Sequence, residues 1–268
     1  MRAPVSLSLC LALTLAYGCS GSTKDTSTGS DSTADTDTNS VDSNMGGDSA
    51  GPTGTVDGTV VAYDGPVSNI SVQACVTQCY TTRTDATGAF HFTGMRAGNY
   101  KIDAIGFGTT DHGDERVPAT LADDASAWTA PSPMFLPQLF GPVVMTTSKT
   151  YTFGPIAWTV DPSTLTVDPL AGDANTLWAG VVPASGIGAF WGVTPSLAVA
   201  FGPLGTVATG TFTMAITSDI AAGDYDVYSV DAIGQIGAPV GSATADGTTV
   251  NLTATPPYLT WLLIAPKT

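Results

Sequence analysis

The stretch that decides the fold is TDATGAFHFTGMRAGNYKIDAIG, residues 84–106. Its first five residues, Thr84–Gly88, combine the Asp, Thr and Gly typical of a tight turn. The following Phe90-His91-Phe92 alternates apolar and polar side chains, which places the two phenylalanines on the core face of a strand and the histidine outside. A second alternating strand is entered through Gly98-Asn99-Tyr100. Strands bounded by such turns predict β-structure here.

The rest of the chain extends this pattern. Asp-Gly turns at Asp57-Gly58 and Asp64-Gly65 separate valine-rich runs upstream, and short β-like runs with Gly and Pro between them continue downstream to Leu259–Ile264. The 30 Gly and 18 Pro residues, and the scarcity of Glu, Lys, Gln and Arg, disfavour helix. The segment Ala221–Gly234 echoes residues 96–106. We therefore expect an all-β chain with two β-sandwich modules.

Three motifs carry a family resemblance within about residues 54–110. Pro66-Val67 to Val72, Thr84 to Phe92 and Gly98 to Ile102 occupy the positions of a pattern that resembles the carboxypeptidase regulatory-like domain. The resemblance implies a prealbumin-type antiparallel β-sandwich with an accessory, non-catalytic role. We expect this module over residues 54–128 and a second β-rich, sandwich-like module over 129–268, beginning with a Pro-rich connector.

The N-terminus has the pattern of an export signal. A basic start precedes an apolar run, Val5–Ala16, that is too short to span a bilayer, so residues 1–18 are predicted to be a signal peptide. Ala16 to Cys19 resembles the lipobox of bacterial lipoproteins, although Leu15 stands one position earlier than in that family. The resemblance implies acylation of Cys19, a lipid bilayer as partner, and a place at the bacterial cell envelope, on the periplasmic or the surface face of the outer membrane. The alternative is ordinary cleavage after Gly18, which leaves an unmodified Cys19.

The cysteine count bears on this choice. Cys10 is lost with the signal peptide, and acylation of Cys19 leaves Cys75 and Cys79 to pair in an oxidising compartment. Residues four apart on a straight strand lie about 13 Å apart, so a disulfide requires the three intervening residues to turn back as a hairpin. A metal site is the alternative, but two thiolates lack further ligands.

Residues 19–53 are predicted to be a disordered linker rich in Ser, Thr, Asp and Gly. Residues 20–53 contain no aromatic side chain and six aspartates, so they cannot bury enough apolar surface to fold. A calcium-binding tail is a weaker interpretation, because the aspartates lack the spacing of a calcium loop. The whole chain has a formal net charge of −15 and only eight Lys and Arg, which argues against a nucleic-acid partner.

Three tryptophans are candidates for stacking on a sugar. Trp158, Trp178 and Trp191 lie in the second half of the chain, where exposed rings would form a carbohydrate-binding surface. Packing in a β-core is nevertheless the favoured interpretation for these rings. Trp191 is the best candidate for exposure, since the glycines around it in GIGAFWGV (186–193) indicate a loop. Cell-wall or other glycans, or envelope proteins, are the expected partners.

No motif predicts catalysis. His112 and Glu115 have the His-x-x-Glu spacing of zinc carboxypeptidases, but such a site needs another histidine downstream and none follows His112. Asp123 and Asp124 are neighbours and would point to opposite faces of a strand, which makes them a poor acid–base pair. We therefore expect no catalytic residue, no metal, no cofactor, and a binding or structural role. An unrecognised hydrolase stays open as a less favoured alternative.

Overall fold

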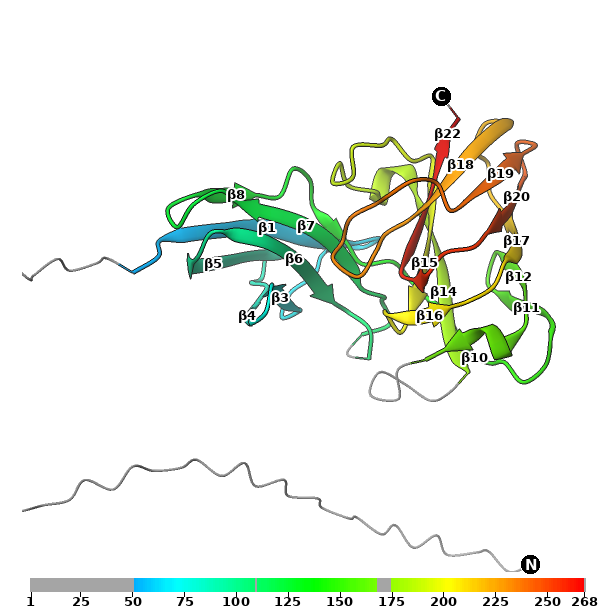
Figure 1. Ribbon diagram of the computed structural model, residues 1–268, viewed down its shortest axis with the longest axis horizontal. Helices are drawn as coiled ribbons and strands as arrows, with labels where there is room; N and C mark the ends of the chain where they lie inside the picture. Colours follow the sequence, from blue (N-terminus) through cyan, green and yellow to red (C-terminus); the bar gives the residue numbers. More distant parts are fainter. Residues whose placement is uncertain (1–50, 109, 168–174, 268) are drawn as a thin grey trace, which may run out of the picture. The chain divides into compact units, whose positions relative to one another are not determined.

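The computed structural model describes residues 51–108, 110–167 and 175–267, which are mostly β-strand (Figure 1). Among these residues there is no α-helix, and two short 3-10 turns interrupt the strands: η1 (Pro162–Thr164) and η2 (Ala184–Gly186). The all-β prediction is confirmed for this part of the chain. The expected signal peptide, Cys19 and nearly all of the expected linker lie outside the described residues. In the described ranges, no helix has the length and apolar character needed to cross a bilayer.

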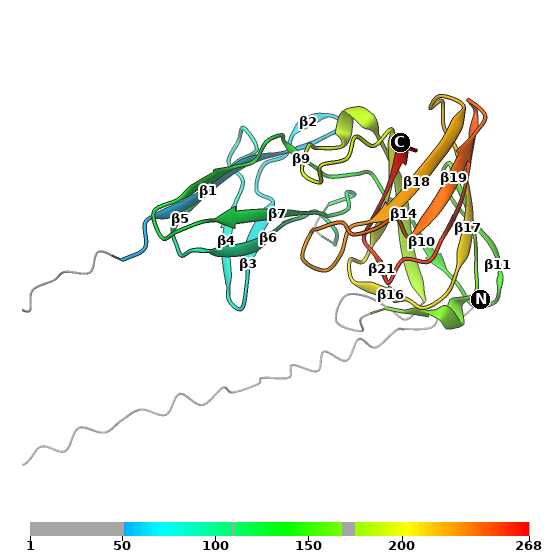
Figure 2. The ribbon, with the colours of Figure 1, turned by 45° about the horizontal axis from the view of Figure 1, so that its top comes forward.

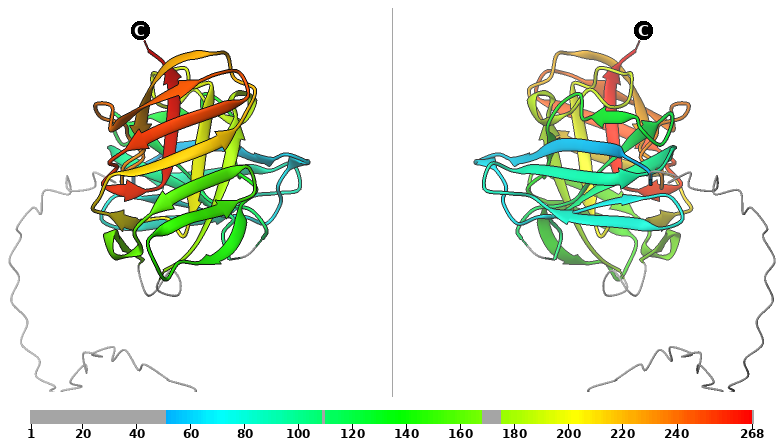
Figure 3. Two further views of the ribbon diagram at one scale, coloured as in Figure 1. Left: turned by 90° about the vertical axis from the view of Figure 1, so that its right-hand side faces the viewer. Right: turned by 90° about the vertical axis from the view of Figure 1, so that its left-hand side faces the viewer.

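The first strands form two sheets. In one, β1 pairs with β2 and β5 in antiparallel fashion and with β8 and β9 in parallel. The bounds are β1 (Gly54–Ala62), β2 (Gly65–Pro66), β5 (Ala89–Met95), β8 (Ala127–Thr129) and β9 (Met134–Phe135). The other is antiparallel, in the order β4 (Cys79–Arg83), β3 (Ser71–Cys75), β6 (Gly98–Ile105), β7 (Glu115–Leu121). The right-hand view of Figure 3 brings these strands to the front.

The stretch quoted above folds as its pattern indicates. Phe90 and Phe92 are buried and His91 between them is exposed, so the predicted alternation is confirmed. The turn before them is held by the carboxylate of Asp85, which accepts the backbone N–H groups of Thr87 and Ala89 at 2.8 and 2.9 Å. Gly88 closes this turn with φ +77°, and a Cβ there would lie 2.4 Å from the carbonyl oxygen of Val60. Only glycine fits that position without strain.

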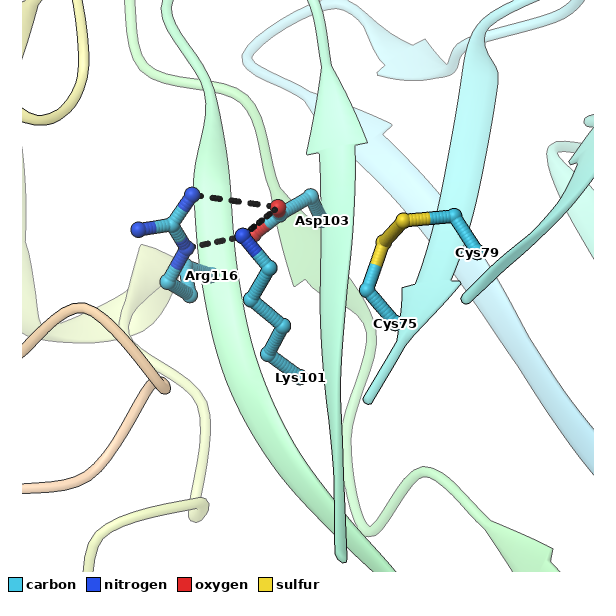
Figure 4. The surroundings of a disulfide bond; sticks show 5 residues. All are labelled: Cys75, Cys79, Lys101, Asp103 and Arg116. Carbon is cyan, nitrogen blue, oxygen red and sulfur yellow. Dashed lines mark hydrogen bonds and ion pairs between the residues drawn. A yellow bond between two sulfur atoms is a disulfide. The ribbon is translucent and has the colours of Figure 1, made fainter. Parts of the chain in front are cut away.

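Cys75 and Cys79 form a disulfide across the β3–β4 hairpin (Figure 4). The two residues stand directly opposite each other, with their Cα atoms 4.1 Å apart, and the backbone N–H of Val76 donates to the carbonyl of Gln78 to close the turn. The predicted bond and the predicted reversal of the chain are both confirmed. On the neighbouring strands, the buried carboxylate of Asp103 accepts two hydrogen bonds from Arg116 and lies 3.3 Å from Lys101 Nζ (Figure 4).

The remaining strands build a ten-stranded antiparallel sheet in the order β10-β14-β15-β22-β18-β19-β20-β17-β12-β11. The bounds are β10 (Phe140–Val144), β11 (Lys149–Phe153), β12 (Ile156–Val160), β14 (Thr176–Pro183), β15 (Leu197–Gly202), β17 (Phe212–Thr217), β18 (Gly223–Ser229), β19 (Gly241–Ala245), β20 (Thr249–Ala254) and β22 (Trp261–Pro266). A small sheet, β13 (Leu165–Thr166), β16 (Thr206–Ala208) and β21 (Tyr258–Leu259), lies beside it. The two end strands, β10 and β11, are consecutive in the chain, so the sheet must curl back on itself (Figure 2).

Curling encloses one hydrophobic core, and a second core lies outside it. The first cluster fills the concave side of the ten-stranded sheet around Trp158. The second is shared: it combines residues of the first two sheets with residues of β15 and β22 that face the other way. The described residues accordingly form one compact unit. The module boundary expected at residue 128 falls within β8, and β9 beyond it also pairs with β1.

The echo between residues 96–106 and 221–234 has a structural counterpart. Both segments contain a strand, β6 and β18, that is entered through Gly-x-Tyr. In each case the tyrosine hydroxyl donates to the carbonyl four residues earlier, from Tyr100 to Arg96 at 2.9 Å and from Tyr225 to Ala221 at 2.7 Å. Each ring is buried while its hydroxyl ties down the approach to the strand. The similarity is one of local corner geometry.

Glu115, the only glutamate in the chain, is fully buried at the start of β7. Its Oε2 accepts the backbone N–H of Phe135 at 2.5 Å, while Oε1 has no hydrogen-bond partner within the described residues. Burial raises the pKa of this carboxyl well above its usual 4.5, and the N–H of Phe135 only partly opposes that shift. An acid whose folded-state pKa is raised favours the folded protein at low pH and loses that contribution as pH rises through the raised value.

We therefore predict that the free energy of unfolding falls as pH rises from 4.5, and that Glu115→Gln removes the part of this fall due to Glu115. The amide still accepts the N–H of Phe135 but carries no charge, so the variant should gain stability relative to the wild type as pH increases. Denaturant unfolding of both proteins between pH 4.5 and 8 measures the difference. Parallel pH profiles would contradict the prediction.

Candidate functional site

The candidate site is a cleft of about 670 Å³ beside the loop that follows β6. Two aromatic rings, Phe107 and Trp178, stand on its wall, and the rest of the lining combines polar residues and glycines with one leucine. The other lining residues are Gly108, Thr110, Asp111, His112, Gln138, Leu139 and Gly141. They come from three separate parts of the sequence: the loop between β6 and β7, the segment that leads into β10, and β14.

Glycines make room for the two rings. Phe107 and Trp178 meet edge to face, with ring centroids 4.8 Å apart and an interplanar angle of 81°. A Cβ on Gly141 would lie 2.6 Å from Trp178 Cδ1, and a Cβ on Gly202 would lie 2.7 Å from the ring of Phe107. Side chains at those positions would displace the rings. Both rings are half-buried, so part of each stays open to the cleft.

The loop that carries Phe107 is fixed by Asp114. This carboxylate is 8% exposed and accepts the backbone N–H of Phe107 at 2.7 Å. The carbonyl of the same residue accepts the indole N–H of Trp261 at 2.9 Å. Burial raises the pKa of Asp114 to about 6, although hydrogen bonds from the backbone of Phe107 and Gly106 act in the opposite direction. Asp114 therefore connects the loop that forms the cleft wall to Trp261 of the second core.

The polar groups of the cleft come from the loop that carries Phe107 and from the segment before β10. His112 forms a single β-bridge with Gln138, and the N–H of Gly113 donates to the carbonyl of Pro137 at 2.7 Å. These contacts hold the loop against the segment that leads into β10. The side chains of Asp111 and Gln138 are exposed and present hydrogen-bonding groups near the two rings. Such a mixture of apolar faces and polar groups suits a ligand that has both characters.

Of the three tryptophans predicted as stacking candidates, only Trp178 keeps an open ring. Trp158 is fully buried between Phe201 and Phe212, at centroid distances of 5.5 and 5.2 Å. Trp191 is 8% exposed and donates its indole N–H to the carbonyl of Gly234 at 2.9 Å. The stacking prediction is therefore wrong for Trp158 and Trp191. The glycines around Trp191 do mark a loop, but the loop folds its ring into the second core against Trp261.

The His-x-x-Glu spacing does not form a site. His112 lies at the rim of the cleft, whereas Glu115 is fully buried and bonded to the backbone of Phe135. In the described residues no group of three or more His, Cys, Asp and Glu side chains could hold a metal ion. The lining of the cleft pairs no nucleophile with a base in any hydrogen bond of the described structure.

A second cavity, of about 690 Å³, is lined by His91 and Asp57. His91 Nδ1 lies 2.5 Å from Asp57 Oδ1, on facing positions of β5 and β1. Both side chains are well exposed, and the nearby Arg83 is bound to the carbonyl of Asn69 at 2.7 Å. Its lining offers no tryptophan or tyrosine ring for stacking. It therefore ranks below the Trp178 cleft as a functional site.

The sequence interpretation missed Phe107, Asp111 and Gln138. The Gly- and Asp-rich run after β6 indicated a loop, but no local pattern says which distant segment that loop will meet. The comparisons with known proteins add nothing here: no family model matches the chain, and no curated protein matches its sequence.

We predict that Trp191→Ala destabilises the protein by about 3–5 kcal/mol, because the substitution leaves a cavity in the second core. The loss also removes the hydrogen bond to Gly234. Trp178→Ala is the matched control and should cost much less, since that ring is only half-buried. Urea unfolding of the three proteins compares them. Equal midpoints for the wild type and Trp191→Ala would show that this ring does not support the core.

Proposed function

We propose that this chain is a non-catalytic glycan-binding protein of the bacterial cell envelope. The observation that carries the proposal is the cleft in which Trp178 and Phe107 stand beside Asp111 and Gln138. A pyranose ring has apolar C–H faces, which stack on aromatic side chains, and hydroxyl groups, which need polar partners. The cleft supplies both kinds of group within one volume of about 670 Å³.

The position of the rings supports this use. They are held in place without a ligand, because Asp114 bonds the backbone of Phe107 and because the two rings pack edge to face over Gly141 and Gly202. Preorganised side chains lose little conformational entropy when a ligand binds, so even a small contact area is used efficiently. A weakly stacking ligand such as a sugar benefits most from this.

The anchor is proposed from the sequence alone. We infer that signal cleavage leaves Cys19 acylated in a lipid bilayer, and that residues 20–53 form an acidic, disordered tether. A flexible coil of that length has a root-mean-square span of roughly 30–35 Å. We further propose that the folded body consists of two β-sandwich modules, of which the first is of the carboxypeptidase regulatory-like kind. Such a body would work within tens of ångströms of its membrane.

Trp178→Ala should weaken glycan binding without unfolding the protein. An aromatic contact of this type is worth about 0.5–1.5 kcal/mol, so affinity should fall about three- to tenfold. A glycan array with the lipid-free protein identifies ligands, and calorimetry with wild type and variant measures the loss. Far-ultraviolet circular dichroism checks that the variant stays folded. If no glycan binds, or if the variant binds as well as the wild type, the proposed function is wrong.

Cys19→Ser should release the protein from membranes, because Cys19 is the proposed attachment point for acyl chains. Fractionation of cells that express each form, followed by a salt wash, measures the distribution. Cys10→Ser is the matched control, since that cysteine lies within the proposed signal peptide and should not affect the mature protein. Retention of Cys19→Ser in the membrane fraction after the wash would refute the anchor and leave the glycan proposal untouched.

A further inference from the structure

Another cavity, of about 650 Å³ and distinct from the one lined by His91, adjoins the Trp178 cleft and forms a second compartment beside it. The side chain of Gln138 lines both cavities, and the neighbouring residues Phe140 and Gly141 line one each. Two aromatic rings face this second compartment, Tyr63 at 54% and Phe140 at 39% exposure. In the part of the chain that the structure describes, they are the aromatic members of the exposed large apolar side chains.

The rings of the second compartment are held in place, as those of the first are. The hydroxyl of Tyr63 donates to the carbonyl of Val181 at 2.9 Å, and its ring packs edge to face on Phe135 with centroids 4.9 Å apart. Phe140 lies over Gly154, where a Cβ would come within 2.6 Å of the ring. An exposed apolar ring that is fixed by specific contacts indicates a binding surface more strongly than one that moves freely.

The charged residues that line the two compartments favour an uncharged ligand over an anionic one. Neither lining contains a lysine or an arginine, and each contains one aspartate, Asp111 in the first and Asp219 in the second. The chain as a whole carries a formal charge of −15. A polyanionic chain would meet only repulsion here, while the hydroxyls of Ser196, Thr217 and Ser218 offer neutral hydrogen-bonding partners.

We propose that the two compartments are subsites for one uncharged oligosaccharide chain, which crosses Gln138 and places sugar rings against Trp178 and against Tyr63 and Phe140. This inference rests on the proposed function and extends it from a sugar to a polysaccharide. A chain that fills both subsites gains the second contact at high effective concentration, so affinity rises steeply with its length. A single sugar gains nothing from the second subsite.

The test is calorimetry with neutral oligosaccharides of two and six units, namely α-1,4- and β-1,4-linked glucose and β-1,4-linked N-acetylglucosamine. The hexamer of the bound series should bind at least about tenfold more tightly than the dimer. Tyr63→Ala and Phe140→Ala should each weaken the hexamer about three- to tenfold and leave the dimer unchanged. Trp178→Ala should weaken both. A hexamer of galacturonic acid, which is anionic, should not bind.

Two matched variants serve as controls. Tyr63→Phe keeps the ring and should keep hexamer binding, and Ile233→Ala removes an exposed apolar side chain that lines neither compartment. Equal affinity for dimer and hexamer, unchanged hexamer binding in both Tyr63→Ala and Phe140→Ala, or binding of the galacturonate hexamer overturns the two-subsite inference. In those cases the effect of Trp178→Ala on glycan affinity still tests the proposed function separately. If the wild type binds a glycan on the array but none of the neutral series, the two-subsite inference falls and the proposed function stands. If it binds no glycan at all, both fall.

Discussion

The burial of β15 and β22 on both faces is the constraint on which the rest of the structure depends. Leu197, Val199 and Phe201 point into the first core, while Ala198 and Ala200 between them point into the second. On β22 the same division separates Leu262 and Ile264 from Trp261 and Leu263. A strand that serves two cores cannot face water on either side, so the early sheets must cover it. Burial of apolar surface thereby joins the two halves of the folded unit.

Polar groups then fix how the halves meet. The indole N–H groups of Trp261 and Trp191 each donate to a backbone carbonyl, of Asp114 and Gly234, because a buried donor without a partner would cost the fold free energy. Gly234 approaches β7 so closely that a Cβ would lie 2.8 Å from the carbonyl carbon of Val117. These contacts are directional, whereas apolar burial is not. They fix the position at which the loop after β6 contacts β14.

The proposed binding cleft is a consequence of that contact between the loop and β14. It lies where the loop with Phe107 meets Trp178, and neither element has an open pocket by itself. Asp114 and Glu115 stand next to each other at the start of β7, and both are buried with raised pKa values. The first holds the loop and the second bonds the backbone of β9. Two costly buried acids beside the cleft indicate that the geometry of this region is maintained at some expense in stability.

The turn expected at Asp57-Gly58 is wrong, because β1 continues through both residues and pairs them with β5. The sequence by itself determined the alternating strands, the turn at Thr84–Gly88 and the β3–β4 disulfide. These depend on local alternation, on glycine and aspartate at tight turns, and on two cysteines in reach of each other. The fate of each tryptophan depended on tertiary structure. Trp191 sits among glycines and is buried, whereas Trp178 sits in an apolar strand and keeps part of its ring open, because exposure is set by what packs on a residue from elsewhere in the chain. The cleft could not be predicted either, since its walls come from segments that local patterns do not connect.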